Sequence, residues 1–215
     1  MSYVNYICAG AVVLVSEKLS VSETQDGLDA LLYCQAVASG KVPEFANFER
    51  WMNANAGAVR TLGGLVLSEP CIDVPPPRSG RFSLSEMIAP VLSQLAHTST
   101  EALQVSLRAL SLHASALLQS EVLDTPTAQT QQTVRLKYAV ISPGVSIAAV
   151  VICFRFDEKF TGPVLSYRFA AENVIGNVSI RGYRALMETE DYDLSRETVI
   201  SLLGCQRQER IIRLT

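Results

Sequence analysis

The apolar stretch VSIAAVVICFRF at Val145–Phe156 constrains the fold more than any other part of the sequence. As a helix it would extend roughly 18 Å, too short to cross the roughly 30 Å hydrocarbon core of a bilayer. As a strand it would extend about 40 Å, and most of its residues are β-branched or aromatic, which favours a strand. A strand this apolar is either buried on both faces of a soluble sheet or placed against lipid.

The composition allows one large domain with much apolar surface to bury. We expect a single domain over residues 1–215, because a chain of this length needs no metal or disulfide to stabilise its core. Hydrophobic residues make up 48% of the chain and charged residues only 18%. A net charge of −3 with scattered Arg and Lys gives no basic surface for a polyphosphate, so we expect no nucleic-acid partner.

The cysteines and the N-terminal segment indicate where the chain is made. Five widely spaced cysteines in mostly apolar surroundings are typical of free thiols. No basic residue precedes the apolar run Tyr6–Val15, so this run predicts a strand and not a secretory signal. We therefore expect synthesis in the reducing cytosol without a signal peptide.

The first third of the sequence predicts two helices followed by a loop. Apolar residues at helical spacing predict a helix over residues 28–40, after a polar turn. An aromatic pattern from Phe45 to Met52 predicts the second helix, which the glycines of NANAGAVRTLGG should end. We expect the segment up to Pro75–Pro77 to be an exposed loop.

A helical hairpin is predicted next. Two capping boxes, Ser83 with Glu86 and Thr98 with Glu101, indicate two helix starts separated by a short loop. Short loops join antiparallel helices, so the pair should present one shared apolar face. The residues expected on this face are Met87, Val91, Leu95, Leu103, Leu107 and Leu110.

The second half predicts an antiparallel meander of four strands. Residues 134–140 alternate as a half-buried strand does, with Arg135 and Lys137 on the water-facing side. Turns at Ser142–Gly144 and Asp157–Gly162 then join this strand to Val145–Phe156 and to Val164–Ala171, and NVSIRGYRAL forms a fourth strand. A last helix should begin at Asp193 or Ser195 and end at Gly204, before a short basic tail. The predicted fold class is α+β, with helical layers covering a mainly antiparallel sheet of long strands.

The sequence carries no recognisable catalytic or ligand motif. It has two histidines, His97 and His113, and lacks the spacings of metal sites, phosphate loops or nucleophile elbows. We therefore expect no metal, no cofactor and no enzymatic activity. A site assembled from scattered residues stays open as an alternative, with Cys153, His97 and His113 as its candidates.

The order of these elements, ending in NVSIRGYRALMETEDYDLSRETVISLLG, resembles the Cyt-type cytolytic toxin family of Cyt δ-endotoxins and volvatoxin. The resemblance spans most of the chain and implies an α/β/α sandwich. It also implies that the protein binds membrane phospholipids, self-associates on the membrane and permeabilises a target cell after release, by a pore or by detergent-like lysis.

In this family the helical layers are thought to move off and the long strands to meet the bilayer. The helical cover would correspond here to residues 84–118, and the membrane-engaging strands to residues 134–140, 145–156 and 164–171. The candidate membrane-engaging residues are Val134, Leu136, Tyr138, Val140, Ile147, Val150, Ile152, Phe154, Phe156, Leu165, Tyr167 and Phe169.

One observation speaks against a membrane role for the most apolar strand. A strand that lines a pore alternates lipid-facing and water-facing residues, whereas Val150–Ile152 is apolar throughout. An interaction or assembly protein, such as a viral structural subunit or an intracellular effector, would explain the same composition and the missing chemistry.

Overall fold

The computed structural model describes residues 2–43, 47–77, 80–110, 123–124, 132–158 and 164–214. The strands of the main sheet are β1 (Tyr3–Cys8), β2 (Ala11–Ser16), β3 (Gly64–Ser68), β4 (Cys71–Val74), β6 (Leu123–Asp124), β7 (Gln132–Ser142), β8 (Ser146–Phe156), β10 (Val174–Met187) and β11 (Ile211–Leu214). The short strands β5 (Arg81–Phe82) and β9 (Phe169–Ala170) pair with each other. The helices are α1 (Val21–Lys41), α2 (Phe48–Thr61), α3 (Leu84–Ala96), α4 (Thr100–Leu110), α6 (Thr189–Leu203), α7 (Gln206–Arg210) and the 3₁₀ turn Ala171–Asn173.

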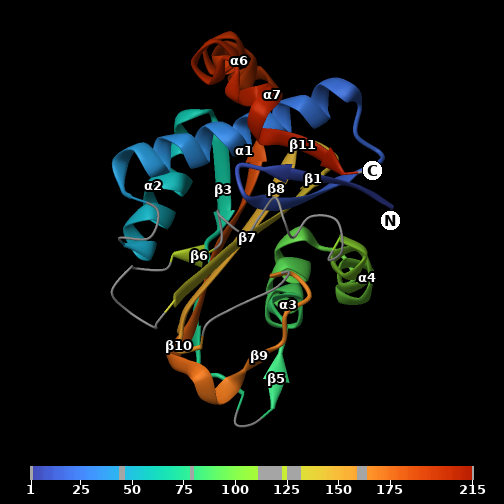
Figure 1. Ribbon diagram of the computed structural model, residues 1–215. Helices are drawn as coiled ribbons and strands as arrows, with labels where there is room; N and C mark the ends of the chain where they lie inside the picture. The colour runs from blue at the N-terminus through green and yellow to red at the C-terminus, as the bar shows by residue number, and fades with distance from the viewer. Residues whose placement is uncertain are drawn as a thin grey trace.

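The main sheet is twisted and lies between two helical layers (Figure 1). The strand order is β11-β1-β2-β7-β8-β10-β3, with β4 also on β10 and β6 on β7. Strands β2 and β7 pair in parallel, and every other described pair is antiparallel. Figure 1 shows α1 and α2 on one face of the sheet and α3 and α4 on the other.

Each face of the sheet has its own hydrophobic core. Apolar residues of α3 and α4 pack with one face of β7, β8 and β10. Apolar residues of α1, α2 and α6 pack with the opposite face. Helices on both faces of a mainly antiparallel sheet confirm the predicted fold class.

The N-terminal apolar run forms a hairpin, so the prediction of one strand over Tyr6–Val15 is wrong. The chain reverses at Ala9 and Gly10, which have φ values of +46° and +74°. Positive φ at both central residues is typical of the type I′ turns that join two-residue hairpins. Because the turn consists of small apolar residues, the sequence shows no polar break there.

The first two helices differ from their predicted bounds. Helix α1 begins at Val21, inside the predicted polar turn, because Ser20 and Glu23 form a capping box. Helix α2 begins after its cap Asn47 and continues through Gly57 to Thr61, so Gly57 does not end it. It ends before Gly63, which has a φ of +79°, so the later glycines of the segment follow its end as predicted. The start predicted at Phe45 lies outside the described residues.

The predicted exposed loop before the proline cluster is instead the edge of the sheet. Strands β3 and β4 both pair with β10, with a register shift between Arg184 and Ala185. The box of Ser83 and Glu86 caps α3 as predicted, and Pro90 lies inside that helix. The box predicted at Thr98 is wrong, because α4 begins at Thr100 and the Ser99 hydroxyl accepts from the Ala102 N–H.

The meander has three long strands in place of the predicted four, because the strand predicted over Val164–Ala171 does not form in it. Residues 164–166 form a turn, and only Phe169–Ala170 is a strand, which pairs with β5 outside the main sheet. The turn before β8 is confirmed, while the one predicted over 157–162 lies partly outside the described residues. Strand β10 therefore lies directly beside β8.

The C-terminal segment returns to the N-terminal hairpin. Helix α6 begins at Thr189, four residues before the predicted cap Asp193, and ends at Gly204 as predicted. The tail forms α7 and the edge strand β11, which pairs with β1. Both chain ends therefore lie at the same edge of the sheet (Figure 1).

Candidate functional site

The α3-facing side of the three long strands is a continuous apolar surface. Its polar residues lie near strand ends, at Gln132, Ser142, Ser146 and Arg184. Directly opposed residues of neighbouring strands point to the same face of the sheet, so the register places the apolar residues of the three strands next to one another. The buried apolar residues of this surface are Val134, Leu136, Tyr138, Val140, Ala148, Val150, Ile152, Phe154, Phe156, Val174, Val178 and Ile180.

The side facing α1 and α2 has a different chemistry. Four cations lie on neighbouring strands here: Arg135, Lys137, Arg155 and Arg181. Cys153 of β8 stands between Arg135 of β7 and Ser179 of β10, and Val151 stands between Lys137 and Arg181. The apolar residues Val150 and Ile152 face the α3 side, and Val151 between them faces the side that carries the cations.

Two of these cations are buried beneath α2. Arg135 is 1% exposed and Lys137 is 5% exposed, so the predicted half-buried, water-facing position is wrong for the protein in this form. The guanidinium of Arg135 lies 4.2 Å from the ring centroid of Trp51, and the Lys137 ammonium donates to the Ala9 carbonyl at 2.7 Å. An aromatic face attracts a desolvated cation, so α2 supplies part of what replaces water around them.

Eight of the twelve predicted membrane-engaging residues lie together on the α3-facing side. They are Val134, Leu136, Tyr138, Val140, Val150, Ile152, Phe154 and Phe156. Ile147 faces the opposite core. Leu165, Tyr167 and Phe169 do not belong to the main sheet at all.

The three residues outside the main sheet pack against its apolar face. The ring of Phe169 contacts those of Phe154 and Phe156, each at a centroid distance of 5.1 Å, and lies 4.8 Å from Tyr167. Edge-on packing of this kind stabilises aromatic clusters beyond the area that they bury. The alternating aromatic pattern predicted a strand, but it produces a cover over the end of the sheet.

Helices α3 and α4 cover the rest of the apolar face. Leu95, Leu103 and Leu107 are buried in this core, and Met87 and Val91 pack against it while partly exposed. Leu110 is the last residue of α4, and its side chain lies outside the described part of the structure. The predicted helical cover is thus found where the sequence placed it, as far as the chain is described.

In the described part of the chain, three polar side-chain contacts join this helix pair to other elements. Tyr3 Oη lies 3.1 Å from Thr98 Oγ1, Arg168 donates to Glu86 at 3.1 Å, and Arg184 contacts His97. The Ser83 N–H that donates to Glu86 lowers the pKa of this carboxyl, and Arg168 lowers it further. The Arg168–Glu86 pair is exposed, and exposed pairs contribute little to stability.

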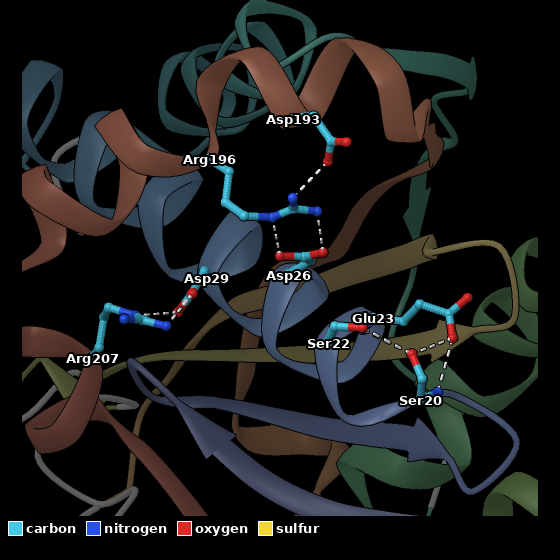
Figure 2. A network of polar contacts seen from close by, with 8 residues as sticks. All are labelled: Ser20, Ser22, Glu23, Asp26, Asp29, Asp193, Arg196 and Arg207. Atoms are coloured by element: carbon cyan, nitrogen blue, oxygen red, sulfur yellow. Dashed lines mark hydrogen bonds and ion pairs between the residues drawn. The ribbon is translucent and has the colours of Figure 1, made fainter.

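Helix α1 is held in a different way, by ion pairs to the C-terminal helices (Figure 2). Arg196 of α6 donates to both carboxylate oxygens of Asp26, at 2.9 and 2.7 Å. Arg207 of α7 binds Asp29 through two nitrogens, at 2.9 and 2.7 Å, and the Asp29 side chain is 2% exposed. Hydrogen bonding to Asp29 raises the pKa of Arg207. Bidentate pairs of this kind are strong and specific in geometry.

These two ion pairs were not among the features predicted from the sequence. Asp26 and Asp29 are three residues apart and therefore share a helix face, which was a detectable signal. Their partners follow about 170 residues later in the chain, and a local sequence pattern cannot predict a contact over this separation.

The two helical layers thus differ in what attaches them to the rest of the fold. Both layers pack on the sheet by apolar contact, and the α1 side has in addition two bidentate ion pairs that join α1 to α6 and α7. Lipid tails can replace apolar contacts, but they cannot replace ion pairs. None of the described helices is both long enough and apolar enough to span a bilayer.

The candidate residues for a scattered catalytic site do not come together. Burial raises the pKa of Cys153 to about 11, which Arg135 opposes only in part, so the thiol is protonated at neutral pH. Cys153 lies on the cation-bearing side of the sheet, whereas His97 ends α3 on the other side. His113 lies outside the described residues. All five cysteines are free thiols, as predicted.

Comparisons with solved structures report on the fold. A δ-endotoxin superposes with a TM-score of 0.52 at 8% sequence identity, over 84% of this chain and 83% of its own. The activated Cyt2Ba monomer from Bacillus thuringiensis subsp. israelensis gives 0.48 at 10% identity, over 81% and 96%. The Evf virulence factor gives 0.36 at 12% identity, over 98% and 85%. No protein-family profile and no curated protein sequence matches the chain. The chain therefore has the α/β fold of the δ-endotoxin, which is the fold that its sequence predicts.

Proposed function

We propose that this protein is a non-enzymatic cytolysin that binds membrane phospholipids, self-associates on them and permeabilises a target cell after release from its site of synthesis. The observation that carries the proposal is the chemical difference between the two faces of the long-stranded sheet. The toxin-like fold agrees with it.

The dimensions of the sheet suit a bilayer. Strands β7 and β8 have 11 residues each and β10 has 14. A tilted strand needs about nine to eleven residues to cross the hydrocarbon core. The three strands also form a continuous antiparallel unit, so their backbone groups stay paired with one another when water is absent.

The two faces then have separate partners on the membrane. The α3-facing side would meet lipid tails once α3 and α4 leave it, at little cost because lipid replaces apolar contacts with apolar contacts. The opposite side carries Arg155 and Arg181, which would face water or headgroups, and Arg135 and Lys137, which stay covered by α2. A single sheet leaves two edges with unpaired backbone groups, so entry into lipid requires several copies side by side.

Dye release from vesicles tests the proposal. Phosphatidylcholine vesicles that contain a small quenched dye and a large labelled dextran should release the small dye on addition of micromolar protein. Release of the small dye alone indicates a discrete pore, and release of both indicates detergent-like lysis. Vesicles that stay intact would contradict the proposal and favour an interaction or assembly protein.

A further inference from the structure

A cavity of about 230 Å³ lies between the C-terminal end of α3 and the end of β3 with the turn that follows it. Its polar lining comes from Arg184, His97, Ser68 and Gln94, and its apolar walls include Leu67 and Val91. None of the residues that line it is acidic. A positively charged cavity with apolar walls suits a ligand that combines an anion with a hydrocarbon part.

Arg184 is the one cation that β7, β8 and β10 place on the α3-facing side. Its Nε is buried and has no hydrogen-bond partner among the described residues. Its Nη1 contacts Nε2 of His97. The negative end of the α3 dipole lies nearby and favours a cation there, but no carboxylate of the described chain pairs with this guanidinium.

His97 stands at this position because of an unusual backbone conformation. It follows the last residue of α3 with φ of +49° and ψ of +46°, a left-handed conformation that costs energy for a residue other than glycine. A guanidinium has no acceptor, so His97 Nε2 accepts from Arg184 and its own ring proton resides on Nδ1. A neutral ring is a weaker partner for arginine than an anion, which can take two donors at once.

We propose that this cavity binds the phosphate group of an amphiphile, with Arg184 as its main ligand. The phosphate oxygens accept from the Nη groups of Arg184 and displace His97 Nε2 from that guanidinium. The hydrocarbon part lies along the apolar walls, where Leu67 is 45% exposed and Leu95 is buried beside it. The assignment to a membrane lipid rests on the proposed function, whereas the phosphate site itself does not.

The site would link lipid binding to the helical layer. His97 and Gln94 belong to the end of α3, and Arg184 belongs to the sheet beneath it. A phosphate that takes Arg184 away from His97 removes one of the three described polar contacts that join α3 and α4 to other elements. Occupation of the cavity would therefore loosen the layer that has to leave.

Binding of soluble probes tests the proposal without membranes. Octyl phosphate, below its critical micelle concentration, and inorganic phosphate are titrated against the full chain by calorimetry. We expect octyl phosphate to bind at least about tenfold more tightly than inorganic phosphate, and Arg184→Gln to weaken its binding about tenfold or more. The matched control Arg213→Gln removes the same charge from the exposed edge strand β11 and should leave binding unchanged.

Histidine resonances show whether the ligand enters this cavity. The chain has two histidines, so the His97 ring signals can be assigned by their loss in His97→Gln. Octyl phosphate should shift the His97 signals and not those of His113. Arg184→Lys, which keeps the charge without the planar fork, should bind with intermediate affinity if Arg184→Gln fails to fold.

Each result bears on one of the two proposals. No binding of either probe, or binding that Arg184→Gln leaves intact, overturns the phosphate site even if vesicles leak. Equal binding of both probes contradicts the proposal of an amphiphilic ligand and indicates a site for free phosphate. Tight octyl phosphate binding by a protein that leaves vesicles intact supports the site and contradicts the proposed function.

Discussion

The double substitution Val150→Thr with Ile152→Thr is expected to lower the initial rate of dye release about tenfold or more. Both residues are fully buried on the α3-facing side of β8. In the proposed membrane form this side meets lipid, where each added hydroxyl loses its hydrogen bonds to water. The penalty is repeated in every copy of the assembly.

The same strand offers a matched control on its other face. Ile147→Thr with Val151→Thr makes the same two chemical changes at residues 2% and 4% exposed, on the side that faces α1 and α2. We expect each double variant to cost about 2 kcal/mol of unfolding free energy per substitution, because both place hydroxyls in a hydrophobic core. Release by the control should stay within about threefold of the parent protein.

Urea unfolding and dye release on both variants give the result, with rates compared at equal folded fraction. Similar losses of stability with unequal losses of release identify the lipid-facing side. Equal release by the two variants would contradict the assignment of one face to lipid.

Trp51→Ala is expected to cost about 3–5 kcal/mol of unfolding free energy. Trp51 is 1% exposed, donates to Ser39 Oγ at 3.0 Å and covers the guanidinium of Arg135. Removing the ring leaves a cavity. It also removes the aromatic face that two buried cations, Arg135 and Lys137, contact. The second effect places the cost at the upper end of that range.

Trp51→Phe separates the two contributions. A phenyl ring still covers Arg135 but cannot donate to Ser39, so we expect a cost nearer 1–2 kcal/mol. Trp51 is the single tryptophan of the chain, so unfolding has to be followed by circular dichroism in urea. A loss below about 1 kcal/mol for Trp51→Ala would show that α2 contributes little to holding the cations.

The layered fold was predictable because its main signals are local. The apolar run of β8, the alternation of β7 and the turn between them fix two central strands to within about two residues. The capping box of α3 and the apolar periodicity of α3 and α4 define the helical cover. These signals need no knowledge of distant partners.

Other elements were not predicted, either because they depend on residues distant in the sequence or because their turn residues resemble the strands around them. The turn at Ala9 and Gly10 carries no polar residue, so one apolar run conceals two strands. Strands β3 and β4 gain their order from β10, more than 100 residues later, while the nearby prolines suggested a loop. The burial of Arg135 depends on Trp51 of α2, which no strand pattern could report.

Hydrogen exchange in the presence of vesicles tests the central claim most directly, namely that α3 and α4 leave the apolar face of the sheet. With phospholipid vesicles added, amides of residues 84–96 should lose protection. Amides of β7 and β8 should keep theirs because they stay paired, and those of α1 should keep theirs because Asp26 and Asp29 hold it to α6 and α7. Unchanged protection of α3 while vesicles release their dye would contradict the account.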